Sequence, residues 1–240
     1  MYNIKYSNHE GNIFDIELRT FDEFHGITLC CVVLNEGKYI EDFIAYYRPY
    51  VNAIAIVDGG SADDTVEIAA SLVDKMIIKQ FDGHYSNQLN RAIEMARTDW
   101  VFFIEPDERL GKTALEKFGE LINQEEYDCY SFPRREYVDN ILYPEIYPDY
   151  QERLFRTYCR RVRPIHGETV GYHNRKDLPK DDIWDIIHSK KMERHKQRNN
   201  GYSLFQNKFA NELGKPGSQT KVSFEIEYPS LPLKDLGKFL

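Results

Sequence analysis

The 240-residue chain lacks the features that mark several large classes of protein. No apolar run approaches the ~20 residues of a membrane-spanning helix, and the polar, acidic start does not resemble a signal peptide. The Gly-x-Gly-x-x-Gly dinucleotide motif and the P-loop motif are both missing. The net charge of −8 gives no overall basic excess for nucleic acid. We therefore expect no transmembrane segment and no general nucleic-acid binder.

Cysteine is scarce, and its spacing excludes the common zinc motifs. The chain has four cysteines, at positions 30, 31, 129 and 159, and none forms a Cys-x-x-Cys pair. Cys30 and Cys31 are adjacent within an apolar run, where small buried side chains are more plausible than a disulfide. The sequence therefore predicts a reduced, cytoplasmic protein.

Apolar runs alternate with amphipathic segments through the first half of the chain. Apolar residues make up 42% and charged residues 29%, as in an ordinary globular domain. Short β-branched runs predict buried strands, and apolar positions at helical spacing predict helices between them. This alternation indicates right-handed crossovers and an α/β sheet with a parallel half. The expected strands are 27–34, 53–58, 75–81 and 100–104, and the expected helices are 35–50, 61–73, 85–97 and 111–124.

The pattern changes after Glu125, and residues 1–25 also differ from the alternating region. Residues 127–140 and 150–157 alternate and contain many aromatics, which predicts antiparallel strands added to the sheet. Residues 189–213 form a charged stretch of helical character, followed by a Pro- and Gly-rich tail. The lead-in is extended, with a hairpin around residues 10–12. The length suits one large domain, or one domain with an appendage.

Polar groups follow three of the predicted parallel strands. Asn35 and Glu36 follow the first, and Asp58 begins an Asp-Gly-Gly-Ser turn after the second. Glu105, Asp107 and Glu108 follow the fourth. Ligands bind outside the carboxyl ends of strands in open parallel sheets. Each motif alone is equally consistent with a solvated loop, but together they predict a cleft.

The acidic stretch at residues 105–108 has two interpretations. Clustered carboxylates repel one another unless a cation lies between them, and hard oxygen ligands suit Mg²⁺ or Mn²⁺. The alternative is structural: Glu108 forms a surface ion pair with Arg109, and Asp107 caps a helix that begins near Lys112. The structural alternative accounts well for Glu108, partly for Asp107 and poorly for Glu105.

The segments "CVVLNEGKYIEDFI", "AIAIVDGGSADDTVEIA" and "NQLNRAIEMARTDWVFFIEPDERL" resemble family-two glycosyltransferases with the GT-A fold. The resemblance covers residues 27–121. It continues more weakly through "YQERLFRT" and "IHGETV", which resemble segments of the lipopolysaccharide-core glucosyltransferase-like branch. It implies a Rossmann-like mixed sheet flanked by helices. Residues 1–125 would form a nucleotide-sugar-binding half, and residues 126–240 an acceptor-binding half with a C-terminal helical tail, within one domain.

The resemblance implies roles for the polar residues at the strand ends. Asn35, Glu36 and Asp58, with Gly60 allowing close approach, would contact the nucleoside, usually uridine. Glu105 and Asp107 occupy the positions of the family's Asp-x-Asp pair, although Glu and Pro replace the first two residues. Asp107 would bind the cation that bridges the diphosphate. Glu105 would contact the ribose, or the metal through water, and His188 would be a further metal ligand. Asn90 and Lys190 would contact the donor. A solvated basic helix face is the equal alternative for His188.

The chemistry of inversion requires a base that deprotonates the acceptor hydroxyl opposite the leaving diphosphate. Glu168 matches the Glu of the family's Val-His-Glu segment, although Gly167 is inserted, and is the candidate base. His166 would orient the base or contact phosphate; a satisfied loop histidine is the alternative. Arg153 would bind the acceptor or the diphosphate, or pair with Glu152 or Asp149.

The leading hypothesis is an inverting, metal-assisted glycosyltransferase that moves a sugar from a UDP-linked donor to an acceptor hydroxyl, with Mn²⁺ or Mg²⁺. A nucleotidyltransferase is an alternative, but "NEGKYIED" after the first strand lacks the Gly-rich basic loop of that class. A non-catalytic nucleotide- or sugar-binding module is another. The acceptor stays open among a glycan, a protein and a modified nucleobase. The basic, aromatic stretch 190–209 is a candidate for peripheral membrane contact.

Overall fold

The computed structural model describes residues 2–7, 13–18, 25–162 and 167–190. They belong to two units, which are described separately. In the first unit, β1 (Tyr2–Ser7) pairs antiparallel with β2 (Ile13–Leu18), from Tyr2 opposite Leu18 to Ser7 opposite Ile13. The hairpin predicted for the lead-in is therefore confirmed. All other described elements belong to the second unit.

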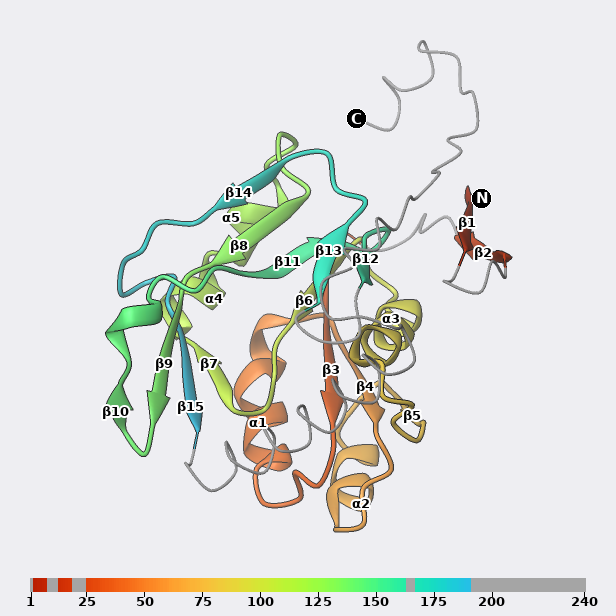
Figure 1. The fold of residues 1–240 in the computed structure, drawn as a ribbon, viewed down its shortest axis with the longest axis horizontal. Helices are drawn as coiled ribbons and strands as arrows, with labels where there is room; N and C mark the ends of the chain where they lie inside the picture. Colours follow the sequence, from red (N-terminus) through yellow and green to blue (C-terminus); the bar gives the residue numbers. More distant parts are fainter. Residues whose placement is uncertain (1, 8–12, 19–24, 163–166, 191–240) are drawn as a thin grey trace, which may run out of the picture. The chain divides into compact units, whose positions relative to one another are not determined.

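The second unit is built on a seven-stranded sheet of order β14-β8-β11-β6-β3-β4-β5 (Figure 1). Its parallel half consists of β3 (Ile27–Val33), β4 (Ala53–Asp58), β5 (Lys75–Ile78) and β6 (Trp100–Phe103). Nearly every residue of β3, β4 and β6 is buried, because helices cover both faces. The four predicted parallel strands are confirmed.

The helices divide between the two faces of this sheet. Alternate residues of β3 show the division: Leu29 and Cys31 pack in one apolar cluster with α1 (Ile40–Tyr47), α4 (Lys112–Glu116) and α5 (Phe118–Ile122). Cys30 packs in a second cluster, with α3 (Tyr85–Met95). The predicted helix over 111–124 is thus two short helices that meet at Lys117. The remaining helical elements are α2 (Thr65–Ala70), η1 (Arg48–Tyr50) and η2 (Pro144–Ile146).

The antiparallel strands predicted to extend the sheet are confirmed, but one of them is divided into two strands. β11 (Gln151–Arg156) runs antiparallel to both β6 and β8 (Cys129–Phe132), and β14 (Arg175–Asp177) lies parallel to β8. The strand expected over 127–140 divides at Pro133, which cannot donate a ladder hydrogen bond. Its second part, β9 (Arg134–Val138), joins another sheet. The predicted α/β fold, with a mixed sheet that is parallel in its N-terminal half, is confirmed.

A four-stranded sheet of order β10-β9-β15-β7 stands beside the carboxyl end of β6. It contains β7 (Glu108–Leu110), β10 (Ile141–Leu142) and β15 (Ile186–Lys190). The register aligns Glu108, His188 and Glu136 in one row across three strands. Residues 189 and 190, expected to begin a helical stretch, are therefore strand, and the rest of that stretch lies outside the described residues. A separate hairpin pairs β12 (Arg160–Val162) with β13 (Glu168–Val170).

Two expectations from composition can be compared with this structure. All four cysteines are free and buried, and burial raises the pKa of each thiol. They serve as small apolar side chains, as the sequence predicts. Among the described residues, no helix is long and apolar enough to cross a membrane.

Candidate functional site

The turn after β4 is organised by the carboxylate of Asp58, which is fully buried. One carboxylate oxygen accepts hydrogen bonds from the N–H groups of Gly60 and Ser61, both at 2.8 Å. The other accepts the hydroxyl of Ser61 at 2.5 Å. The Asp-Gly-Gly-Ser turn is therefore held in one conformation by its own first residue.

Side chains of residues 61–65 also fix the turn that follows β3. Asn35, which has a left-handed φ of 55°, donates its N–H to the hydroxyl oxygen of Ser61 at 2.8 Å. Its side-chain oxygen accepts the N–H of Ala62 at 2.8 Å. Glu36 donates its N–H to the hydroxyl oxygen of Thr65 at 2.7 Å, and its side chain is buried. The two neighbouring strand ends thus form one rigid unit.

Gly60 is required by this turn, because its φ is +98° and an added Cβ would lie 2.3 Å from the side-chain oxygen of Gln80. The left-handed conformation costs about 1–2 kcal/mol for a residue such as alanine. We expect Gly60→Ala to lower the melting temperature by about 2–8 °C at ~2–4 °C per kcal/mol. The control is Gly119→Ala, where nothing lies within 4 Å of the added Cβ. Equal thermal unfolding curves for the two variants would contradict this account of the turn.

The acidic stretch joins β6 to β7, and two of its carboxylates act on a buried thiol together with Glu36, which follows β3. Burial raises the pKa of Cys31, and the negative charges of Glu105, Glu36 and Asp107 raise it further. Cys31 lies in β3, between β6 and β4. The predicted convergence of strand ends is therefore present in the structure.

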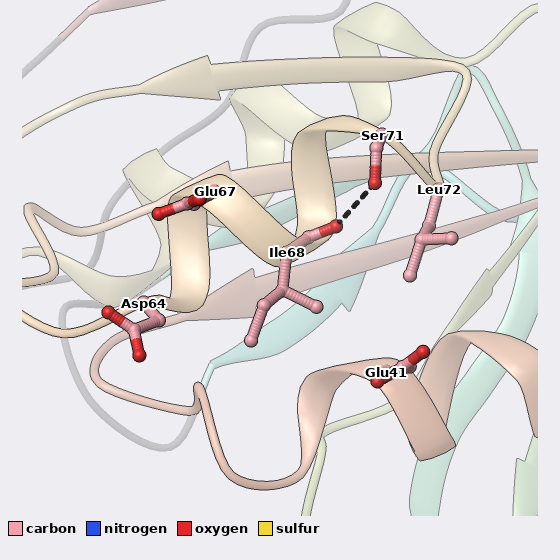
Figure 2. Close-up of a pocket in the computed structure, with 6 residues that line it drawn as sticks. All are labelled: Glu41, Asp64, Glu67, Ile68, Ser71 and Leu72. Carbon is pink, nitrogen blue, oxygen red and sulfur yellow. Dashed lines mark hydrogen bonds between the residues drawn. The ribbon is translucent and has the colours of Figure 1, made fainter.

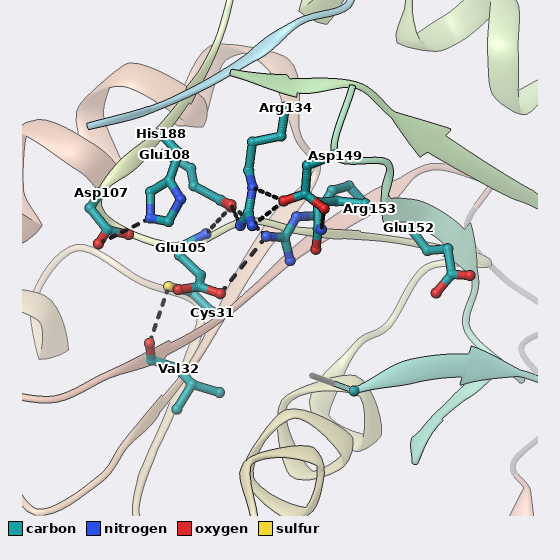
Figure 3. A network of polar contacts seen from close by, with 12 residues as sticks. Cys31, Val32, Glu105, Asp107, Glu108, Arg134, Asp149, Glu152, Arg153 and His188 are labelled. Atoms are coloured by element: carbon teal, nitrogen blue, oxygen red, sulfur yellow. Dashed lines mark hydrogen bonds and ion pairs between the residues drawn. The ribbon is translucent and has the colours of Figure 1, made fainter. Parts of the chain in front are cut away.

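Asp107 faces His188, as Figure 3 shows. A carboxylate oxygen of Asp107 lies 3.4 Å from Nε2 of His188, and Nδ1 of His188 lies 2.8 Å from a carboxylate oxygen of Glu136. The carbonyl oxygen of Asp107 accepts the N–H of Ser189 at 3.1 Å. Burial opposes protonation of His188, but the adjacent carboxylates of Asp107 and Glu136 outweigh it and raise its pKa. The pairing of β15 with β7 and β9 thus creates an Asp107–His188–Glu136 chain.

The side chains of Asp107 and His188 suit a divalent cation whose other coordination positions are filled by a bound small molecule. A metal-binding histidine commonly has its other ring nitrogen on a carboxylate, as His188 has Glu136. Mg²⁺ sites use one or two carboxylates and leave positions for phosphate oxygens and water. No group of three or more His, Cys, Asp or Glu side chains in the described part of the chain forms a metal cage. Asp107 and His188 are therefore the candidate ligands for such a cation, while Glu105 lies 3.8 Å from Arg153.

Glu108 is fully buried, which corrects the structural alternative for the acidic stretch. One of its carboxylate oxygens accepts hydrogen bonds from Arg134 at 3.0 Å and from Arg153 at 2.5 Å. Arg109 instead donates to the carbonyl oxygens of Pro106 and Glu108. The predicted Glu108–Arg109 surface pair is therefore wrong, because pairing of β7 in the small sheet places Glu108 inside. The helix cap predicted for Asp107 is also wrong, since β7 and Gly111 precede α4.

Arg153 is only 2% exposed, and its guanidinium pairs with Glu108. The alternative pairing with Asp149 or Glu152 is wrong. Asp149 pairs with Arg134 at 2.5 Å, and Glu152 pairs with Arg161 at 3.2 Å and with Arg175 at 3.1 Å. Arg153 is therefore connected to the site by its ion pairs with Glu105 and Glu108.

The remaining predicted residues lie on other elements. The side-chain amide of Asn90 donates to the carbonyl oxygen of Arg161 at 2.9 Å and accepts the N–H of Arg161 at 2.8 Å. These two hydrogen bonds join α3 to β12. Glu168 begins β13 and is exposed. His166 and the side chain of Lys190 lie outside the described part of the chain. A depression between α1 and α2 contains none of the predicted residues (Figure 2); it is lined by Glu41, Asp64, Glu67, Ile68, Ser71 and Leu72.

Sequence reasoning missed Arg134, Glu136 and the buried role of Glu108. The alternation in "RREYV" was a usable signal, because Arg134 and Glu136 lie two residues apart and share one strand face. Their partners are distant in sequence, so the signal alone did not connect them to the acidic stretch.

The sequence profile described as Glycosyl transferase family 2 matches residues 28–176. Among similar proteins, the SPbeta prophage-derived glycosyltransferase SunS of Bacillus subtilis is 25% identical over 208 residues, which cover 84% of this chain and 46% of SunS. An uncharacterized glycosyltransferase of Rickettsia felis is 32% identical over 107 residues, 43% of this chain and 38% of that protein. The chain spans about half the length of the first curated relatives.

Among solved structures, glucosyl-3-phosphoglycerate synthase from Mycobacterium tuberculosis in complex with phosphoglyceric acid is 19% identical, with a TM-score of 0.42. The match covers 55% of this chain and 57% of the synthase. The same enzyme with Mn²⁺ and UDP-glucose has a TM-score of 0.39 and 20% identity, and covers 48% of this chain and 44% of the synthase. With the profile match over most of the described sheet, this chain belongs to the glycosyl transferase family 2.

Proposed function

We propose that the chain transfers a sugar, with inversion, from a UDP-linked donor to an acceptor hydroxyl with the help of Mn²⁺ or Mg²⁺. The observation that carries this proposal is the Asp107–His188–Glu136 chain at the carboxyl edge of the parallel sheet. It provides two ligands for a cation beside the rigid turns after β3 and β4. Family membership makes sugar transfer the chemistry that this arrangement supports best.

The donor would lie along the edge formed by the ends of β4, β3 and β6. Asn35, Glu36 and Asp58 are proposed to hold the nucleoside, with Gly60 leaving its backbone open to close approach. Asp107 and His188 would hold the cation, which when bound would neutralise charge on the departing diphosphate. Glu105 and Lys190 are proposed contacts to the ribose or the diphosphate.

Two side chains act on the donor side indirectly. Arg153 is proposed to orient Glu105, from which it lies 3.8 Å away. Asn90 holds β12 against α3 and thereby supports the hairpin that carries Glu168. A direct contact of either side chain with the donor is a weaker proposal, because both amide atoms of Asn90 already bond to Arg161 and Arg153 is only 2% exposed.

Glu168 is the proposed base, because it combines an exposed carboxylate with a firmly held backbone. Arg161 donates hydrogen bonds to the carbonyl oxygen of Gly167, to the hydroxyl of Thr169 at 2.7 Å and to Glu152 at 3.2 Å. The N–H of Thr169 donates to Glu152 at 2.9 Å. A carboxylate placed this way can meet an acceptor hydroxyl and take its proton during attack. His166 is proposed to orient it.

Three further features of the function are proposals. The "RLFR" and "HGE" segments support the lipopolysaccharide-core-like branch. Four free, buried cysteines support a cytoplasmic location. A glycan, a protein and a modified nucleobase are the acceptor classes to compare, and stretch 190–209 is proposed for peripheral membrane contact.

Thermal unfolding with a panel of nucleotides tests the donor. UDP and UDP-glucose with Mn²⁺ are the first ligands to try, because the M. tuberculosis synthase was crystallised with Mn²⁺ and UDP-glucose. A ligand at 100 times its Kd stabilises the folded state by about 2.7 kcal/mol, which corresponds to roughly 5–11 °C here. We expect this shift with uridine nucleotides plus Mn²⁺ and a smaller one without Mn²⁺.

The same panel separates the rival functions. A donor-hydrolysis assay with UDP-glucose and Mn²⁺ follows any positive shift, and binding without turnover for any sugar nucleotide would indicate a binding module. An unchanged melting temperature with every nucleoside diphosphate would contradict the proposed donor site.

A further inference from the structure

We propose that Glu108 is a positioning residue that neutralises the two arginines beside the acidic corner where the cation binds. This inference rests on the proposed function of the Asp107–His188 pair. Glu108 was not among the residues implied by the family resemblance. Its role follows from its contacts within the structure.

Glu108 is the centre of a buried ionic network (Figure 3). Its side chain is 0% exposed, and the side chains of Arg134 and Arg153 are 16% and 2% exposed. Both guanidinium groups donate to the same carboxylate oxygen. A buried carboxylate can remain charged only with such partners, so the three side chains form one electrostatic unit.

The second carboxylate oxygen of Glu108 shapes the turn that carries Asp107. It accepts the N–H of Glu105 at 3.1 Å, while the N–H of Glu108 donates to the carbonyl oxygen of Glu105 at 3.0 Å. Glu108 also lies opposite His188 in the strand register. The side chain thus fixes both ends of the segment that brings Asp107 to His188.

The arginines are close enough to compete for the carboxylates of the site. Arg153 lies 3.8 Å from Glu105, and Arg134 lies 3.9 Å from Glu136, the partner of His188. Arg134 has a further anion, Asp149, at 2.5 Å. Among the described residues, Arg153 forms ion pairs with two carboxylates, Glu108 at 2.5 Å and Glu105 at 3.8 Å.

Loss of the Glu108 charge would therefore affect Arg153 most. Its guanidinium, already 3.8 Å from Glu105, would lose its closest anion and raise the positive potential beside Asp107, where the cation binds. Opposite charges attract more strongly as they approach each other. While Glu108 neutralises the nearby Arg153, the carboxylates at the acidic corner stay available to a divalent cation.

The test measures Mn²⁺ affinity by electron paramagnetic resonance of the full chain, with UDP present. We expect Glu108→Gln to weaken Mn²⁺ binding by about 10-fold or more, as loss of an outer-shell partner commonly does. Glu108→Gln with Arg153→Met removes both members of the 2.5 Å pair. This double variant is expected to recover most of the lost affinity.

The control is Asp177→Asn, which removes an exposed carboxylate paired with Arg175 on β14 and is expected to change Mn²⁺ affinity by less than about threefold. Should Glu108→Gln fail to fold by circular dichroism, the double variant alone serves, with Mn²⁺ affinity expected within about threefold of the wild type. Unchanged affinity in a folded Glu108→Gln protein, or Mn²⁺ binding by the folded double variant that is about 10-fold or more weaker than that of the wild type, would overturn the inference. Absence of Mn²⁺ binding by the wild-type chain with UDP would instead overturn the proposed function.

Discussion

Asp107→Asn is expected to lower the rate of sugar transfer by about 10²–10³-fold, the range found when one group that stabilises transition-state charge is removed. Asparagine keeps the size of the side chain but removes the negative charge that faces His188 at 3.4 Å. The remaining ligand, His188, would hold a cation weakly. The measurement is transfer or hydrolysis of the sugar nucleotide at increasing Mn²⁺ concentration.

Asp177→Asn is the matched control for this substitution. Asp177 is exposed on the edge strand β14 and pairs with Arg175 at 3.1 Å, so its loss is expected to leave the rate within about twofold. Activity of Asp107→Asn equal to that of this control would remove the metal role assigned to Asp107. Full rescue at high Mn²⁺ would place the defect in binding of the cation.

Glu168→Gln is expected to reduce kcat by about 10²–10⁴-fold, the usual contribution of a general base. The change is nearly isosteric, and Glu168 is exposed at the start of β13, so folding stability and donor affinity are expected to stay close to those of the wild type. Steady-state kinetics with the best acceptor, together with UDP binding by calorimetry, provide the two readouts.

Glu67→Gln is the control for the base, because Glu67 is an exposed carboxylate in the depression between α1 and α2 (Figure 2). Its kcat is expected to equal that of the wild type. If Glu168→Gln lost donor binding as well, Glu168 would belong to the donor site. If its kcat matched that of Glu67→Gln, another residue would be the base.

The parallel half of the sheet was predictable because its signals are local. The runs at β3, β4 and β6 are apolar on both faces, and the polar residue types that follow them mark the edge where ligands bind. The mutual bonding of Asn35, Asp58 and Ser61 explains why those residues occur there. It also shows that Asp58 shapes its own turn, a role that sequence reasoning did not include.

The small sheet was not predictable in the same way. β7 is three residues long, and its partner β15 begins at Ile186, far along the chain. Pairing over such a distance is decided by the whole fold, while sequence periodicity reports only local structure. The burial of Glu108 depends entirely on that pairing. A charged residue in an acidic stretch therefore looked like a surface residue, although it lies at the centre of a buried network.

A crystal structure of the chain with UDP and Mn²⁺, using the anomalous signal of manganese, tests the central claim most directly. The account predicts a manganese peak in contact with Asp107 and His188, with the diphosphate of UDP on its open side and the uridine near the turn after β4. Bound UDP with manganese absent from Asp107 and His188, or held by other residues, would contradict it.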